Sequence, residues 1–267
     1  EMEASAAGSL PELITISDVK GVLHNHTTLS DGEASLEQMA DAARRMGLNW
    51  LGIADHSPSL KIANGASAED LLAQCKTIRE YNRNWKNEGT DFRLLSGVES
   101  DILEDGRLDH PDDVLAQIDY VVASVHAMTR WRGRDESQNT EDLLKALDHP
   151  ATTVLGHPTG RILQGREGYE IDLHTILEHM SEANKDGQLK AVEINASPYR
   201  LDLDWRLCKR AKDLQVPIVI NPDAHSIKGL GDIDYGVMIA RKGWLEAGDI
   251  LNSLTCEEIY ERLSLIH

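Results

Sequence analysis

The sequence contains very little aromatic side-chain volume, with a single Phe among 267 residues. An aromatic-rich sandwich core is therefore excluded, although apolar residues make up 41% of the chain and suffice for a sizeable core at this length. That core must be built from Leu, Ile, Val and Ala. Such a composition favours parallel β-strands covered by helices.

A long hydrophobic run is also missing, since no stretch of about 18 apolar residues occurs. The first ten residues show no basic start followed by an apolar block, which a secretory signal would need. The sequence therefore predicts no membrane span and no secretory signal. Cys75, Cys208 and Cys256 are far apart and form no CxxC pair, so we expect no disulfide framework and a cytoplasmic location.

Basic residues are outnumbered by acidic ones, 27 to 45, which gives a formal net charge of −18. This excess argues against non-specific binding of a nucleic-acid backbone, which requires clustered Lys and Arg. It does not exclude a nucleic-acid end as a substrate, because bound cations can reverse the local field. Most of the charge is interpreted as a solvated surface that confers solubility.

Short apolar runs rich in β-branched residues alternate with segments that have the periodicity of amphipathic helices. The predicted strands are 22–26, 50–55, 92–98, 120–125, 152–156, 191–195 and 216–221. The predicted helices include 35–46, 68–85, 173–183 and 205–214, with Ser67 as an N-cap and Gly47 ending the first helix. This alternation predicts an α/β fold with parallel strands, either a closed or nearly closed barrel or an open doubly wound sheet.

The ends of the predicted strands carry the most informative residues, because almost every strand delivers an imidazole or a carboxylate there. They are His24, His26, Asp31, Asp55, His56, Glu99, His126, His157, Asp223 and His225. A lone His at a strand end is more often a solvent-facing side chain than a ligand, and Asn221-Pro222-Asp223 is also good turn chemistry. Six of the eleven histidines nevertheless share the barrel edge at which parallel α/β barrels assemble active sites. The other five, assigned to helices, loops or the tail, are His110, His149, His174, His179 and His267.

Nitrogen and oxygen donors at this edge exceed what one ion can use. Zinc takes about four ligands and manganese about six, so the set implies two or three divalent ions. Cysteine is absent from the set, which points away from a structural zinc site. Mixed imidazole and carboxylate ligands suit Zn²⁺, Mn²⁺ or Fe²⁺ at a hydrolytic centre.

A family resemblance is carried by the motifs at these strand ends. The motifs are His24-Asn25-His26, Ser30-Asp31-Gly32, Ala54-Asp55-His56-Ser57, Gly97-Val98-Glu99, Ser124-Val125-His126, Gly156-His157-Pro158 and Asp223-Ala224-His225. They resemble those of the PHP (polymerase and histidinol phosphatase) superfamily. The stretch from Glu193 to Asp202 and the leading Leu10-Pro11-Glu12-Leu13-Ile14 more narrowly resemble the C-terminal PHP domain of bacterial family X DNA polymerases and the linker before it. No polymerase half is present in this sequence.

The resemblance implies a distorted seven-stranded, TIM-like (β/α)7 barrel with a trinuclear metal centre. Residues 1–18 would be a linker or N-terminal extension, and residues 19–267 the PHP phosphoesterase domain. One ion would be held by His24, His26, Glu99 and Asp223, a second by Glu99, His126 and His157, and a third by Asp31, His56 and His225. Glu99, Asp223 and His126 would be catalytic, through a hydroxide that bridges two ions and attacks phosphorus in line.

Three further residues are candidates for binding substrate. Arg200 and Arg161, each just beyond a strand end, are candidates to grip a phosphate oxygen, with surface salt bridges as the alternative. Asn195 is a candidate to orient a ligand or water, with a plain turn residue as the alternative. Trp131 and Tyr199 are weaker candidates to stack on a base, and packing is the favoured role for both.

The function implied by the polymerase-linked resemblance is hydrolysis of phosphoester bonds at DNA 3′ ends, as an exonuclease, a 3′-phosphatase or both, which fits DNA repair. One alternative is a small-molecule phosphomonoesterase of the histidinol-phosphatase type, which the acidic charge favours slightly. Another is a non-catalytic structural module of a polymerase. The expected partners are DNA 3′ ends or a small phosphomonoester, with a fused polymerase domain in the parent chain and no membrane.

Overall fold

Seven parallel strands lie side by side in the order of the chain in this computed structural model, which describes residues 2–264. The strands are β1 (Gly21–Val22), β2 (Trp50–Ile53), β3 (Arg93–Asp101), β4 (Tyr120–Ser124), β5 (Thr152–Leu155), β6 (Ala191–Asn195) and β7 (Ile218–Asn221). A parallel bridge between Asn25 and Ala224 joins the segments that follow β1 and β7, so the sheet nearly closes on itself. The predicted barrel is confirmed and the open doubly wound sheet is wrong.

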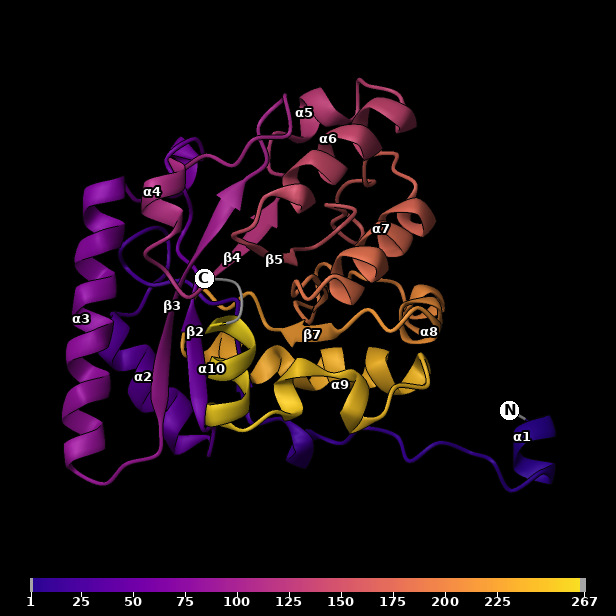
Figure 1. Cartoon of the computed structure of the whole chain (residues 1–267), viewed down its shortest axis with the longest axis horizontal. Helices are drawn as coiled ribbons and strands as arrows, with labels where there is room; N and C mark the ends of the chain where they lie inside the picture. Colours follow the sequence, from indigo (N-terminus) through magenta and orange to yellow (C-terminus); the bar gives the residue numbers. More distant parts are fainter. Residues whose placement is uncertain (1, 265–267) are drawn as a thin grey trace.

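Helices lie outside this sheet and surround it (Figure 1). The α-helices are α1 (Met2–Ala6), α2 (Leu36–Arg45), α3 (Ala68–Asn87), α4 (Asp112–Leu115), α5 (Met128–Trp131), α6 (Glu136–Asp148), α7 (Leu173–Lys185), α8 (Trp205–Asp213), α9 (Ile233–Lys242) and α10 (Cys256–Ser264). The 3₁₀ helices are η1 (Ile16–Asp18), η2 (Lys61–Ala63), η3 (Lys228–Asp232), η4 (Ala247–Asp249) and η5 (Leu251–Ser253). Ser67 caps α3 as predicted, and Gly47 follows α2 in the left-handed conformation, with φ of 82°.

Alternate residues of each strand face the barrel interior, which places the functional groups. On β4, Tyr120 and Val122 belong to the interior cluster, whereas Val121 packs toward the helices. The Tyr120 ring fills the interior so closely that a Cβ at Gly52 or Gly97 would lie 2.4 Å from it. This apolar cluster fills the part of the barrel interior nearer the N-terminal ends of the strands. Polar side chains that also point inward therefore lie at the C-terminal ends of the strands.

The N-terminal ends of the strands are covered by the last helix. Ile259 and Leu263 of α10 join the interior cluster, and the indole of Trp50 donates to the carbonyl of Leu254. The N-terminal segment also packs on the barrel before residue 19, because Ile14 is buried in the core. The domain boundary at residues 18 and 19 stays a prediction.

Two strands differ in length from the prediction. The ladder of β1 ends at Val22, so His24 and His26 lie beyond it in an extended segment rather than within the strand. β3 continues past Glu99 to Asp101 because its second half pairs with β4. Among the described residues, no helix is long and apolar enough to cross a membrane. The three cysteines are free, as expected.

Candidate metal centre

His24 and His26 are held side by side by the backbone between β1 and its neighbours. The amide of His26 donates to the carbonyl of Ala224, and the carbonyl of Asn25 accepts from the amide of Ala54. This pairing keeps the segment extended, so both rings point to the same side. His24 Nε2 lies 3.2 Å from Glu99 Oε2, and His26 Nε2 lies 3.0 Å from Asp223 Oδ1.

Glu99 lies at the centre of the cluster and is only 1% exposed. Five imidazoles approach its two carboxylate oxygens at 2.8–3.6 Å: His24, His26, His56, His126 and His157. The first three contact Oε2, and the last two contact Oε1. A single buried carboxylate with a different set of imidazoles on each oxygen has the arrangement that a ligand bridging two ions requires.

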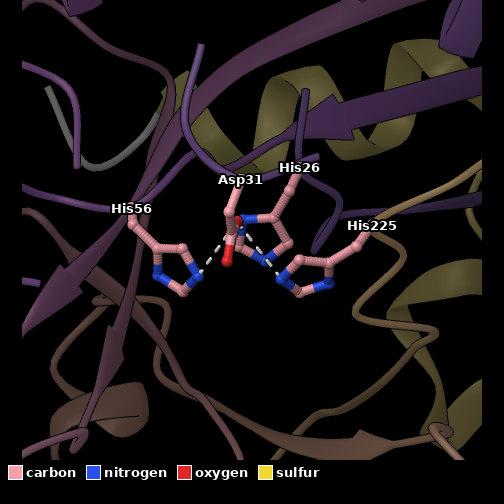
Figure 2. Close-up of side chains that lie close together, drawn as sticks. All are labelled: His26, Asp31, His56 and His225. Atoms are coloured by element: carbon pink, nitrogen blue, oxygen red, sulfur yellow. Dashed lines mark ion pairs between the residues drawn. The ribbon is translucent and has the colours of Figure 1, made fainter. Parts of the chain in front are cut away.

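A second carboxylate, Asp31, organises the outer part of the cluster. Figure 2 shows Asp31 between His56 and His225, with the His26 ring close by. Asp31 Oδ1 lies 3.3 Å from His225 Nε2 and 3.6 Å from His56 Nε2. The His26 ring stacks on the rings of both histidines, at centroid distances of 4.3 Å and 4.1 Å. The three residues predicted to share one ion therefore lie together, with His26 as a fourth.

The polar atoms of the cluster lack the hydrogen bonds that buried groups normally make. No hydrogen bond reaches His24 Nε2, His26 Nδ1, His56 Nδ1, His157 Nδ1 or Glu99 Oε2, although all five atoms are buried. The donors form three groups whose ligand atoms lie within 4.8 Å of one another: His26, Asp31, His56 and His225; His24, His26 and Glu99; His56, Glu99 and His126. Buried groups without partners are costly unless something else satisfies them. These donor sets fit divalent cations.

Two of the predicted ligands adopt a backbone conformation that is unfavourable for residues other than glycine. His157 has φ of 24° and Asp223 has φ of 52°. Each such residue costs about 1–3 kcal/mol, and such residues cluster at functional sites. The positive φ at Asp223 aims its carboxylate back toward His24 and His26, to which it is hydrogen-bonded or ion-paired.

Protonated histidines balance the buried carboxylates when no cation is bound. Burial alone would lower the pKa of His126, but Glu99 and Asp101 raise it to about 10. His225 is likewise opposed by burial, and Asp31 and Asp223 raise its pKa to about 9. His24, His126 and His56 hold the pKa of Glu99 well below its usual value despite burial. The cluster is thus built around positive charge, which either protons or metal ions can supply.

Metal uptake should therefore release protons. At pH 7 the rings of His126 and His225 are protonated in the metal-free chain, whereas a metal ligand must be neutral. Binding is consequently favoured as pH rises toward 9, by about tenfold in affinity per pH unit for each proton released. Titration calorimetry with Mn²⁺ at pH 7, in buffers of different ionisation enthalpy, measures the protons directly. Uptake that releases none and is independent of pH would contradict this account of the charges.

Glu193 and Asp101 belong to the site but were missed from the sequence. Glu193 Oε2 accepts from His24 Nδ1 at 2.8 Å, and Asp101 Oδ1 lies 2.6 Å from His126 Nδ1. Each carboxylate fixes the ring orientation of a histidine whose other nitrogen faces Glu99. The spacing along the strands could have indicated both residues, because side chains two positions apart on a strand point to the same face. Asp101 follows Glu99 by two residues on β3, and Glu193 precedes Asn195 by two residues on β6.

Asp55 supports the loop that carries Asp31. Its two oxygens accept from the amide and hydroxyl of Thr27, the hydroxyl of Ser30 and the amide of Gln74, at 2.6–2.8 Å. With its carboxylate fully occupied in this way, Asp55 positions the loop rather than offering a free oxygen to the cluster.

The three predicted substrate-binding residues have different surroundings. Arg200 lies at the cluster, with Nε 3.5 Å from Asp223 Oδ2. Arg161 instead donates to the backbone carbonyls of Arg200 and Leu201, so its guanidinium braces that loop. Asn195 is fully buried and donates to Glu193 and Asp223 at 3.0 Å. It is therefore placed to orient a ligand and has no exposed atom with which to contact a substrate.

The remaining aromatic and imidazole groups separate clearly from the cluster. Trp131 is fully buried, which agrees with a packing role, whereas Tyr199 is 70% exposed. His149 and His179 pair with Asp112 and Asp148 on the helical surface. His174 is the second residue of α7, His110 precedes α4, and His267 lies outside the described residues.

Comparison with known proteins identifies relatives for most of the chain. A family model described as the PHP domain matches residues 23–197. The Bacillus subtilis protein named DNA polymerase/3′-5′ exonuclease PolX is 42% identical over 248 residues, which is 93% of this chain but 41% of the length of that protein. A protein of Thermoanaerobacter sp. named "Probable phosphatase" is 28% identical over 245 residues, covering 88% of this chain and 91% of its own.

A solved structure supports the fold. The histidinol phosphate phosphatase of Lactococcus lactis, crystallised with zinc, L-histidinol and phosphate, superposes with a TM-score of 0.56 and 16% sequence identity. The superposition covers 84% of this chain and 93% of that protein. At this identity the similarity concerns the architecture of the barrel.

Proposed function

The chain belongs to the PHP domain family, and from this membership we propose that it is a metal-dependent phosphoesterase that hydrolyses phosphoester bonds at DNA 3′ ends. The observation that carries the hydrolytic part of the proposal is the buried carboxylate of Glu99, which meets five imidazoles. Such a centre fits a hydrolase in which bound ions, rather than a Ser or Cys side chain, generate the nucleophile.

We assign nine residues as metal ligands for two or three ions of Zn²⁺, Mn²⁺ or Fe²⁺. They are His24, His26, Asp31, His56, Glu99, His126, His157, Asp223 and His225. The three groups of mutually close donors contain seven of these residues, and Asp223 and His157 contact that set through His26 and Glu99. His56 lies 3.6 Å from Asp31 Oδ1 and 2.8 Å from Glu99 Oε2, so it would connect the donor group around Asp31 with the one around Glu99.

When bound, divalent ions lower the pKa of water enough to supply a nucleophile near neutral pH and neutralise charge on phosphoryl oxygens. The chain's own residues set the geometry for this chemistry. Glu99 fixes the spacing of the histidines, and Asp223 is held in turn by Asn195. Glu193 and Asp101 keep His24 and His126 in the orientation that presents Nε2 to the centre. Arg200 has a buried Nη1 without a hydrogen-bond partner, which is available to a phosphate oxygen.

Two substrate classes compete. The 42% identity to a protein named as a polymerase and 3′-5′ exonuclease supports DNA ends, and the chain's span of 41% of that protein supports a polymerase domain fused in the parent chain. The 28% identity to a probable phosphatase, matched over 91% of its length, favours a small phosphomonoester. The complete donor set speaks against a purely structural module. A cytoplasmic location and a place in DNA repair are part of this proposal.

A substrate comparison decides between these classes. With Mn²⁺ present, we expect nucleotides or phosphate to be removed from a 5′-labelled oligonucleotide that ends in a 3′-hydroxyl or a 3′-phosphate. Activity should be weak and salt-sensitive, because a chain at −18 has little basic surface to hold a duplex. Histidinol phosphate serves as the matched small substrate. Fast turnover of histidinol phosphate with both oligonucleotides untouched would assign the chain to the second class.

A further inference from the structure

Two arginines that no sequence motif indicated, Arg132 and Arg166, lie on the segments that follow His126 and His157 in the chain. Arg166 Nε donates to the carbonyl of Gly160 at 3.3 Å, and Gly160 is three residues beyond His157. The side chain of Arg166 lines a hollow of about 460 Å³ together with Arg132, Thr129 and Gly133. The hollow therefore lies between the loop that follows His157 and the segment formed by α5 and the two residues after it.

No counter-charge compensates these two side chains. Within residues 2–264, no carboxylate oxygen lies within ion-pair distance of Arg132 or Arg166, although the chain has 45 acidic residues. The loop that carries Arg166 meets the loop that carries Arg200, because the amide of Leu163 donates to the carbonyl of Tyr199 at 2.6 Å. Partial burial lowers the pKa of Arg166, and the positive charges of Arg200 and Arg132 lower it further. Like charges placed together destabilise the free protein, and an anion bound between them relieves that repulsion.

Arg200 joins this group to the catalytic cluster. Its Nε faces Asp223 Oδ2 at 3.5 Å, and its side chain is 16% exposed. Its buried Nη1 has no hydrogen-bond partner. Arg200 at Asp223, Arg166 on the neighbouring loop and Arg132 on the wall of the same hollow thus form a group of positive charges in an otherwise acidic chain. Tyr199, the residue before Arg200, is 70% exposed.

We propose that the hollow lined by Arg132 and Arg166 binds a second phosphate, the one adjacent to the scissile phosphate of a single-stranded nucleic-acid end. This inference rests on the proposed phosphoesterase function and narrows its substrate to a chain with at least two phosphates. Arg200 takes the phosphate at the metal centre, and the outer guanidiniums grip its neighbour through bidentate hydrogen bonds. Tyr199 offers a stacking surface to a base. A small phosphomonoester has no group for the outer position.

The test compares two substrates that differ in the number of phosphates. Trithymidylate has a phosphate next to the scissile one, whereas thymidine 5′-(4-nitrophenyl phosphate) has only the scissile phosphate. In the variant carrying both Arg132→Gln and Arg166→Gln, we expect KM for trithymidylate to rise about tenfold or more, from the loss of charge-assisted hydrogen bonds. KM and kcat for the single-phosphate substrate should stay unchanged. The variant carrying both Arg262→Gln on α10 and Arg83→Gln on α3, neither of which lines the hollow, is the matched control for the loss of two positive charges.

A binding measurement makes the result independent of turnover. Fluorescein-labelled trithymidylate with phosphorothioate linkages is titrated with each protein and followed by anisotropy, beside labelled thymidine monophosphate. Weaker binding of the trinucleotide alone in the double variant supports the second phosphate site, even if the unaltered chain hydrolyses nothing and the phosphoesterase proposal fails. Unchanged binding, or an equal loss for both probes, overturns the second site while leaving any observed hydrolysis intact.

Discussion

Replacing Glu99 by Gln is expected to reduce hydrolysis by on the order of 10³-fold or more, because Glu99 is the carboxylate that would be shared by two ions and a neutral amide would hold them more weakly. The substitution keeps the size of the side chain but removes the negative charge that five imidazoles face. The steady-state rate of hydrolysis with saturating Mn²⁺ measures the loss of activity. Elemental analysis shows whether the variant also binds fewer metal ions.

Asp31→Asn is the matched comparison, because it also replaces a carboxylate by an amide at a residue that contacts histidines. Asp31 is more exposed than Glu99 and contacts two histidines, His56 and His225. Its loss of activity should be clearly smaller than that of Glu99→Gln. Thermal unfolding of both variants separates a catalytic loss from a folding defect, because burying an unpaired group at position 99 also affects stability. Equal or reversed losses would refute the bridging role.

Chelation should abolish hydrolysis to the background rate, and added Mn²⁺ should restore it. The reason is that the cluster offers no side-chain nucleophile; Cys75 and Cys208 are buried, and burial raises the pKa of each thiol. Circular dichroism should show that the chelated chain stays folded, since protonated histidines then balance the carboxylates. Full activity in the presence of a strong chelator would contradict the mechanism.

The barrel could be predicted because its physical causes are local. Each strand is a short apolar run, and each following segment has helical periodicity, so a parallel sheet follows from the alternation. The end of β1 could not be predicted in the same way. His24 and His26 lie beyond the ladder that ends at Val22, in a segment where Asn25 pairs with Ala224. The residues after β7 are remote in sequence and become neighbours of this segment only when the barrel nearly closes.

The donors of the site could also be predicted, since strand ends meet at one edge whatever the exact packing. Their outer partners were harder to see. Glu193 is a charged residue in a strand whose every residue is buried. Its contacts with His24, Asn195, Asn221 and the amide of His157 explain that burial. The roles of the loop arginines could not be predicted from the sequence. Arg161 and Arg166 lie five positions apart in one loop, and loop geometry alone decides that the first binds backbone carbonyls and the second faces the hollow.

The most direct test of the central claim is the number of ions at which hydrolysis saturates. Chain freed of metal is titrated with Mn²⁺ while bound ions per chain and the rate of phosphoester hydrolysis are measured on the same samples. The account predicts that the rate stays near background with one ion bound and reaches its plateau only when two or three ions are bound, as the shared Glu99 carboxylate requires. A full rate at one ion per chain, or with none, would contradict it.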